Sequence, residues 1–388
     1  MEGIGYSIPY LLFVALLIGL SILERTRQND LLRSSFCRFS CSMLYLLFIG
    51  LRGYIGTDWY SYQQIFDQTP TLFSGGWDLF WPDNWLEPGF VLFTSSVKTV
   101  WNDYHFFVFV SACLDMAILH VFLKRYVGWY TLGFLVFFVM GGLTLCDLMR
   151  NVRGIGFFLL SLRYLRERRA LPYFGLNLLG MCFHISSIVY LPFYWVLHRR
   201  WPKAVFIVIF LLGNFVFLLR LEFVRPLIEW GTEVLGGRFA YLSAQYLLNE
   251  MFDERYWLSL GYAERILTSL LILGFYRKLH RQRETNVLFI NTYVLYFLFF
   301  FFFSEIRELA ARLSLLFIFA YWVLLPALYE TLREHFNRAV FITALYVYCL
   351  LKTAGMTSIP LYRYDNLLWG IESYGRRIEE FERYYLNR

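Results

Sequence analysis

Three charged residues interrupt a long apolar part of the sequence. Asp147, Arg150 and Arg153 lie in CDLMRNVRGIGFF, between two apolar runs. Arg150 and Arg153 are three residues apart and therefore share one face of a helix. A guanidinium group stays charged and binds phosphate oxygens through paired hydrogen bonds. The spacing indicates either an anion site, such as one for a lipid diphosphate, or arginines that extend toward lipid headgroups.

Two further arginines and a histidine have similar surroundings. Arg307 and Arg312 lie in SEIRELAARLSLLF, where a loop meets an apolar segment, and His184 interrupts MCFHISSIVYLPFY. A histidine with an ordinary pKa of about 6.5 can act as a general base. A histidine in an apolar run can equally be a packing residue that hydrogen-bonds to another helix. The residue types alone leave both roles for His184 open.

The composition places these side chains in a membrane protein. The 388 residues are 58% hydrophobic and 21% aromatic, with a mean hydropathy of +0.49. This exceeds what a soluble core can bury. The net charge of +7 is therefore interpreted loop by loop, and we expect no nucleic-acid partner. The sequence has no P-loop, GxGxxG, HExxH or Asp-x-Asp motif, and we expect neither a cofactor nor a metal site.

The apolar runs predict the elements that must position the charged residues. Runs this long fit helical spans of about 20 residues better than barrel strands of about 10. We predict an all-α polytopic membrane protein with about 10–12 transmembrane or re-entrant helices. The apolar segments are 6–23, 39–51, 104–123, 129–146, 154–165, 172–197, 204–219, 260–275, 286–303, 309–329 and 336–351.

The short connections between these segments predict the orientation. They are rich in arginine and lysine and poor in acids, which places them in the cytoplasm. All basic connections lie on that side only if two segments do not cross the membrane. Residues 88–101 must form an interfacial or re-entrant helix. Residues 172–197 must enter the membrane and return to the same side, with a break near CFHISS. Both termini are then outside. Residues 1–388 form a single integral membrane domain with external segments 52–103, 221–259 and 353–388.

The first external segment has a composition that suits sugars. It is rich in tryptophan and tyrosine and carries the acids Asp58, Asp67, Asp78, Asp83 and Glu87. Aromatic faces stack on sugar rings, and carboxylates accept hydrogen bonds from hydroxyl groups. An aromatic belt at the membrane interface would have a similar composition. With this topology, we expect the four arginines and His184 to converge on one external cavity.

Five short motifs follow one another along the chain: LRGYIGTDWYSYQQIF, LEPGFVLF, LMRNVRGIGFFLLSLRYL, FGLNLLGMCFHISSIVYLPFYWVL and ARLSLLFIFAYWVLLP. In this order they resemble the EpsG family of Wzy-type polymerases of O-antigen, capsular and exopolysaccharide repeat units. The resemblance covers most of residues 45–200 and returns near 305–330.

The resemblance assigns family positions to individual residues. The first-loop pattern R-G-x-G-x-D-x-x-x-Y corresponds to Arg52, Gly53, Gly56, Asp58 and Tyr62. The Leu-Arg-Gln-x-x-Ala helix start appears as Met149, Arg150, Asn151 and Gly154, and Phe-His-x-Ser appears as Phe183, His184 and Ser186. The chain departs from the family at Asn151 and Gly154, and Arg153 is an additional charge.

The resemblance implies a GT-C-like, metal-independent glycosyltransferase at the outer face of the bacterial cytoplasmic membrane. It would join repeat units linked to undecaprenyl diphosphate, in contact with membrane lipid, a Wzz-like chain-length regulator and a flippase. His184 is the first candidate for the base, and Asp58 or Asp147 is the second. The implied substrate-binding residues are Arg52, Tyr62, Glu87, Arg150, Arg153, Arg307 and Arg312.

Two other functions use similar chemistry. An O-antigen ligase shares the arginine and histidine requirements but transfers the glycan to lipid A, and the first-loop motif favours the polymerase over it. A flippase or transporter would bind the same lipid diphosphate and move it across the membrane. Transporters usually carry a two-fold internal repeat, which is not evident in this sequence.

Overall fold

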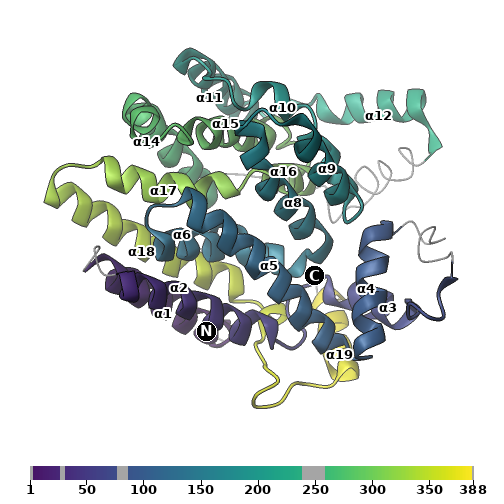
Figure 1. Cartoon of the computed structure of the whole chain (residues 1–388). Helices are drawn as coiled ribbons and strands as arrows, with labels where there is room; N and C mark the ends of the chain where they lie inside the picture. The colour runs from purple at the N-terminus through teal and green to yellow at the C-terminus, as the bar shows by residue number, and fades with distance from the viewer. Residues whose placement is uncertain (1–2, 27–30, 77–85, 238–257, 387–388) are drawn as a thin grey trace. The chain divides into compact units, whose positions relative to one another are not determined.

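The computed structural model describes residues 3–26, 31–76, 86–237 and 258–386 (Figure 1). In this part of the chain helices dominate, and β-structure is limited to isolated bridges. The prediction of an all-α protein is confirmed. The contacts divide the chain into two compact units, Met1–Val196 with Glu334–Arg388, and Leu197–Arg333. The single membrane domain stays a prediction, and each unit is described by itself.

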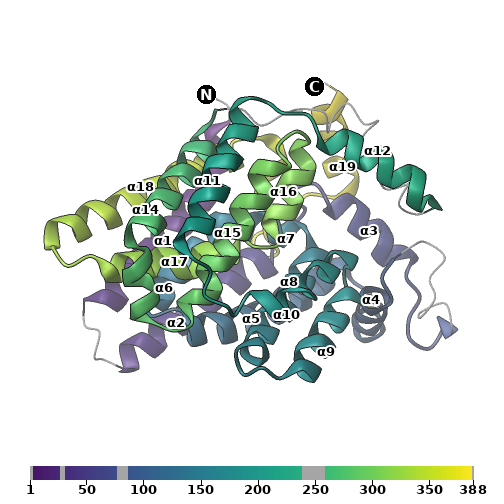
Figure 2. The ribbon, with the colours of Figure 1, turned by 90° about the horizontal axis from the view of Figure 1, so that it is seen from above.

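The first unit contains most of the predicted site residues. Its helices are α1 (Ile4–Arg25), α2 (Leu31–Tyr45) with a π-helical turn at Leu46–Gly50, α3 (Trp59–Gln68), α4 (Pro88–Val100), α5 (Tyr104–Tyr126), α6 (Tyr130–Phe137) with a π-helical turn at Phe138–Gly142, α7 (Leu143–Asp147), α8 (Met149–Arg166), α9 (Ala170–Met181), a 3-10 helix at Ile185–Tyr190, α10 (Phe193–Val196), α18 (His335–Thr357), a 3-10 turn at Pro360–Tyr362 and α19 (Tyr374–Leu386). In Figures 1 and 2, α8 and α9 lie side by side, as do α1 and α18.

The second unit packs around a phenylalanine core. Phe217, Phe297, Phe300 and Phe301 form a buried cluster. The consecutive helices α16 and α17 are bent by 64° relative to each other. The helices of this unit are α11 (Lys203–Leu218), α12 (Val224–Leu235), α14 (Leu260–Gln282), α15 (Asn286–Phe302), α16 (Arg307–Leu315) and α17 (Phe319–Thr331).

The described helices are those of a polytopic membrane protein. Four are long and apolar enough to cross a bilayer: α1, α5, the α6–α7 run Tyr130–Asp147, and α18. The bent pair α16–α17 adds a fifth candidate. Shorter apolar helices are Ala170–Met181, Ile185–Val196, Lys203–Leu218 and Asn286–Phe302. The orientation of these helices across the membrane stays a prediction.

Two local predictions match the observed elements. The segment predicted as an interfacial or re-entrant helix is α4, whose 13 residues extend about 20 Å and are too short for a bilayer core of about 30 Å. The segment 172–197 is interrupted after Met181, where His184 has an extended backbone before the 3-10 helix begins. The break therefore falls at CFHISS as predicted, and it places the His184 side chain at a helix end.

Candidate functional site

Glu87, Arg150 and His184 form one charged cluster in the first unit. The Arg150 Nη1 donates to Glu87 Oε2 at 3.0 Å, and His184 Nδ1 lies 3.1 Å from Glu87 Oε1. The Glu87 residue is 8% exposed, so its carboxylate is paired and largely removed from water. Burial alone raises the pKa of Glu87, but the hydrogen bond from His184 and the Arg150 charge outweigh it and lower this pKa to about 2. The carboxylate is therefore ionised at neutral pH.

The short sequence Glu87-Pro88-Gly89 brings this carboxylate to the helix break. Pro88 starts α4, and the Gly89 N–H donates to the Cys182 carbonyl at 2.8 Å. A Cβ atom on Gly89 would lie 2.8 Å from the same carbonyl oxygen, so a side chain there would displace the contact. The Ile185 N–H also donates to Glu87 Oε1, at 3.2 Å. The start of α4 and the 182–185 break therefore fix each other and orient His184.

Asp58 and Asp147, the alternative candidates for the base, meet at the first-loop motif. Asp147 Oδ1 accepts the Asp58 N–H at 3.0 Å, and Asp147 Oδ2 accepts the Thr57 N–H at 2.8 Å. The Thr57 hydroxyl lies 3.0 Å from Asp147 Oδ2 and 3.3 Å from Asp58 Oδ1. Gly56 has φ +89°, and a Cβ atom there would lie 2.5 Å from the Asp147 carboxyl group. Glycine is therefore required where the loop passes Asp147.

Tyr62 connects the two groups of residues. Its hydroxyl oxygen accepts the Arg150 N–H at 3.2 Å. Burial, with the neighbouring Asp58 charge, raises the pKa of Tyr62 to about 12, and the phenol stays neutral. Hydrogen bonds and ion pairs thus connect six of the predicted site residues in one region of the first unit: Asp58, Asp147, Tyr62, Arg150, Glu87 and His184.

Arg52, which the sequence analysis assigned to the substrate, has protein partners in the structure. Its Nη1 donates to the Ile49 carbonyl at 2.9 Å and its Nη2 to the Cys146 carbonyl at 2.8 Å. The residue is 7% exposed. Arg52 therefore joins the π-helical turn after α2 to the end of α7, next to Asp147. Its contact with substrate stays a prediction.

Arg153 is fully buried, with 0% of its surface exposed. Its Nε lies 4.0 Å from Asp115 Oδ1 on α5, and its Nη1 donates to the Met149 carbonyl at 2.6 Å. The guanidinium also lies 4.7 Å from the centre of the Phe93 ring on α4. Arg153 thereby joins α8 to α5 and α4, and its predicted role in binding substrate stays a prediction. The sequence analysis missed Asp115, although an acid in the middle of an apolar span was a usable signal.

Arg307 and Arg312 lie on α16 of the second unit, and both side chains are exposed. Arg312 Nε pairs with Glu308 Oε1 at 2.6 Å, four residues away on the same helix. In the same unit, Glu305 Oε2 accepts the N–H groups of Phe223 and Val224 at the start of α12. The convergence of these two arginines with Arg150 and His184 stays a prediction.

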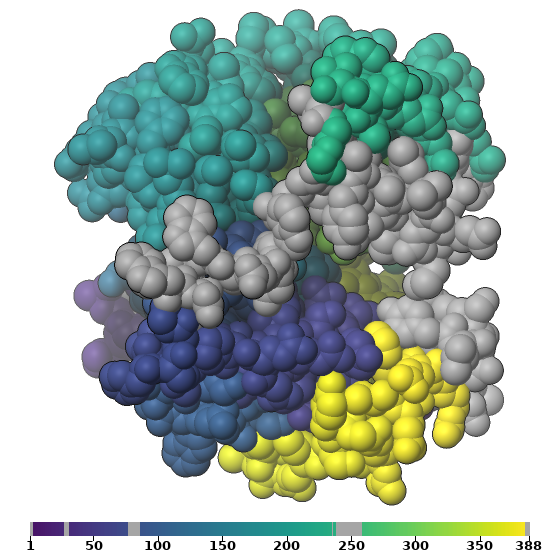
Figure 3. Space-filling view, turned by 90° about the vertical axis from the view of Figure 1, so that its right-hand side faces the viewer, coloured from purple at the N-terminus to yellow at the C-terminus, as the bar shows by residue number. Residues whose placement is uncertain are grey.

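The C-terminal segment covers the first-loop motif within the first unit. The Gly53 N–H donates to the Asp365 carbonyl at 3.1 Å, and the Gly56 N–H donates to the Leu361 carbonyl at 3.0 Å. In Figure 3 the yellow C-terminal residues lie directly against the dark blue and purple residues of the N-terminal part. Described residues of the segments 52–103 and 353–388, both predicted to be external, are therefore in direct contact.

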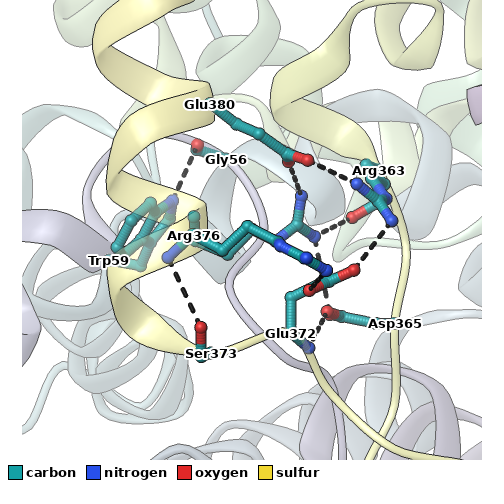
Figure 4. A network of polar contacts seen from close by, with 9 residues as sticks. Gly56, Trp59, Arg363, Asp365, Glu372, Ser373, Arg376 and Glu380 are labelled. Atoms are coloured by element: carbon teal, nitrogen blue, oxygen red, sulfur yellow. Dashed lines mark hydrogen bonds and ion pairs between the residues drawn. The ribbon is translucent and has the colours of Figure 1, made fainter.

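A network of ion pairs holds this C-terminal segment in shape (Figure 4). Arg363 pairs with Glu372 at 2.9 Å and with Glu380, and Arg376 pairs with Glu372 at 3.1 Å. Arg377, which is 3% exposed, pairs with Glu380 at 3.1 Å and lies 3.5 Å from Asp365. We refer to these residues, Arg363, Asp365, Glu372, Arg376, Arg377 and Glu380, as the C-terminal ion-pair network.

Aromatic side chains complete the contact between the loop and the C-terminal helix. The Tyr60 and Phe381 rings stack with centroids 5.5 Å apart, and Trp59 lies 5.7 Å from Phe381 and 5.9 Å from Tyr374. The Trp59 indole N–H donates to the Gly56 carbonyl at 3.2 Å. These aromatic residues therefore pack within the protein. Asp78 and Asp83, the other acids predicted for this segment, lie outside the described residues.

The geometry combines a possible proton acceptor with a fixed cation. If His184 Nδ1 carries the proton that faces Glu87, its Nε2 holds a free lone pair, the arrangement that a general base requires. Arg150 has an Nε that is buried and has no hydrogen-bond partner within the described residues, and its side chain is 29% exposed. An unused buried donor of this kind favours an anionic ligand.

Comparison with known proteins identifies a family. A family model described as the EpsG family matches residues 35–366 of this chain. This range includes the first-loop motif, the Arg150 helix start, the His184 break and α16. Searches of curated proteins and of solved structures return no significant match.

Proposed function

Because this chain belongs to the EpsG family, we propose that it is a polysaccharide polymerase that joins oligosaccharide repeat units linked to undecaprenyl diphosphate. The family is associated with glycosyltransferase-like polymerases of exopolysaccharides. The observation that supports the reaction best is the bridge in which the Glu87 carboxylate binds both His184 and Arg150. It links the site for the proton to the site for the leaving group.

In the proposed reaction, a sugar hydroxyl of the incoming repeat unit attacks the anomeric carbon of the growing chain. The new C–O bond forms as the bond from that carbon to the diphosphate oxygen breaks. His184 accepts the hydroxyl proton through Nε2, while Glu87 holds Nδ1 and stabilises the imidazolium. Undecaprenyl diphosphate leaves with the electron pair, and Arg150 stabilises its negative charge without a metal ion.

Asp58, Asp147 and Thr57 position the first loop in this proposal. Their hydrogen bonds fix the first-loop motif beside Tyr62, and Tyr62 in turn accepts the Arg150 N–H. We propose that Asp58 binds acceptor hydroxyl groups, and that Asp58 or Asp147 serves as the base if His184 does not. The proposal also places the reaction at the outer face of the cytoplasmic membrane. A Wzz-like regulator and a flippase are its proposed partners.

The size of the accumulated glycan tests the proposal. In a host that makes O-antigen, loss of this chain should leave lipid A core with a single repeat unit. Loss of a ligase would instead leave long polymer on undecaprenyl diphosphate, and loss of a flippase would trap single units inside the cell. Glycan ladders unchanged on deletion of the whole chain would overturn the polymerase proposal.

The same assay tests His184. His184→Ala should reduce polymerisation by about 10²- to 10⁴-fold, the usual contribution of a general base. The variant should still bind the lipid-linked repeat unit, because Arg150 is unchanged. His335→Ala is the matched control, since His335 is exposed at the start of α18. Equal activity in the two variants would remove His184 from the reaction and leave Asp58 or Asp147 as the candidate base.

A further inference from the structure

The chain carries an exposed apolar turn immediately before the C-terminal helix. Leu367, Leu368 and Trp369 are 42%, 64% and 68% exposed. Three consecutive large apolar side chains on the surface are unfavourable in water unless another surface covers them. We refer to these three residues as the apolar tip.

The backbone of the apolar tip is held firmly. Asn366 is 1% exposed, and its side chain donates to the Leu47 carbonyl at 2.8 Å and accepts the Leu368 N–H at 3.0 Å. The Leu367 N–H donates to the Leu51 carbonyl at 2.9 Å. Asn366 and Gly370 pair as a bridge, with Gly370 at φ +102°. The exposure of the tip therefore belongs to a fixed turn.

The neighbours of this turn give its depth relative to the membrane helices. The Tyr364 ring stacks on Phe48 with centroids 4.3 Å apart and lies 5.7 Å from the Tyr10 ring on α1. Tyr10 lies six residues inside α1, which corresponds to about 9 Å along the helix axis. After α18 ends at Thr357, the chain therefore returns to the depth of Tyr10 in the candidate membrane span α1.

The helices around the tip expose apolar side chains at the same level. Ile8 and Leu12 of α1 are 52% and 62% exposed, and Leu47, whose carbonyl binds Asn366, is 40% exposed. Because α1 is long and apolar enough to cross a bilayer, such side chains must contact lipid. Through the Asn366 side chain, the apolar tip is joined to Leu47, one of these exposed residues.

We propose that Leu367, Leu368 and Trp369 insert into the bilayer leaflet and bind phospholipid acyl chains. The tip fixes the C-terminal segment at a set height on the membrane surface. Through the Gly53–Asp365 and Gly56–Leu361 hydrogen bonds, the same contact fixes the first-loop motif at that height. Tryptophan suits this position, because its ring is apolar and its N–H can remain in the interface.

Photocrosslinking in the full-length protein tests this contact without requiring activity. Benzoylphenylalanine replaces Trp369 or, in a second variant, Leu368, and the protein is reconstituted in vesicles of phosphatidylethanolamine and phosphatidylglycerol that contain no glycan substrate. Glu379→benzoylphenylalanine on the exposed face of α19 is the matched control. Mass spectrometry of the illuminated, correctly inserted fraction identifies each adduct.

We expect phospholipid adducts at positions 368 and 369, at least tenfold above the level at position 379. Equal lipid labelling at all three positions would overturn the proposal, as would the absence of adducts at 368 and 369. Crosslinks to a second copy of the chain would assign the tip to a protein interface. In a parallel sample with lipid-linked repeat units, adducts that form only with the prenyl chain or the glycan would also overturn it.

Discussion

The two arginine pairs that the sequence presented as equivalent differ in their surroundings. Arg153 is fully buried and lies 4.0 Å from the largely buried Asp115, whereas Arg150 is partly exposed and pairs with Glu87 beside His184. Arg307 and Arg312, in the second unit, are exposed, and Arg312 pairs with Glu308 on its own helix. An arginine near a helix start therefore does not by itself predict an anion site. The prediction also depends on which carboxylates of the protein already pair with that arginine. Burial then decides how much each side chain contributes to the fold.

The largest effect on stability is expected at Arg153. Arg153→Ala should lower the free energy of unfolding by about 3–5 kcal/mol, because it leaves Asp115 buried without its partner. Thermal unfolding in detergent micelles measures the change. The double variant Arg153→Met, Asp115→Leu should recover most of the loss, since both buried charges are gone. A double variant no more stable than Arg153→Ala would contradict the role of this pair.

Substitution of Arg150 should lower the free energy of unfolding less than substitution of Arg153, but it should strongly shorten the polymer. Arg150→Ala removes a charged hydrogen bond to Glu87 and should cost about 1.5–3 kcal/mol. Arg150→Lys should regain much of that stability and little of the polymer length, because an ammonium group lacks the paired donors. Full polymer length in the lysine variant would show that charge alone is sufficient.

The Glu87 carboxylate, which pairs with Arg150, should make the stability of the protein depend on pH. Its pKa falls from 4.5 to about 2 in the folded protein. Between these values the unfolded chain binds more protons than the folded one, so stability decreases as the pH falls. The stabilisation is complete above pH 4.5 and is lost toward pH 2.

The measurement compares melting temperatures of the wild type and Glu87→Gln. Their difference should shrink as the pH falls below about 4.5. Glu379→Gln, at an exposed position on α19, is the control and should follow the wild type at every pH. A difference that stays constant down to pH 3 would contradict the ionised, paired Glu87.

The smallest effect on stability is expected at Arg312. Arg312→Ala removes an exposed pair and should change the free energy of unfolding by less than about 0.5 kcal/mol. If Arg312 binds substrate, as the family resemblance implies, this variant should nevertheless shorten the polymer. Glu308→Ala is the matched control, because it breaks the same pair and keeps the guanidinium. Equal polymer length in both variants would limit Arg312 to its contact with Glu308.

Much of the site could be predicted because its signals are local in the sequence. The break at CFHISS followed from the side on which basic connections must lie, and the structure breaks there. The residue types at Asp58, Glu87, Arg150 and His184 suggested a chemistry for each residue, and the structure connects these residues in one region of the first unit. Their roles stay predictions.

The remaining features depend on long-range packing, which no local pattern encodes. The Thr57 hydroxyl lies between Asp58 and Asp147 only because the loop turns at Gly56. The π-helical turn at Leu46–Gly50 has an apolar sequence that fits an ordinary helix equally well. The C-terminal ion-pair network contacts residues more than three hundred positions earlier, and its sequence resembles that of any charged surface helix.

The contact between the first loop and the C-terminal segment also sets an order in time. Residues 52–59 are made well before their partners, because Leu361 and Asp365 lie about 300 positions later in the chain. At about 5–20 residues per second, the roughly 300 residues between them take roughly 15–60 s to synthesise. Throughout that interval the Gly53 and Gly56 N–H groups lack their final acceptors. The loop is therefore completed only after Leu361 and Asp365 have been made, and a nascent chain that has not reached them lacks the completed loop.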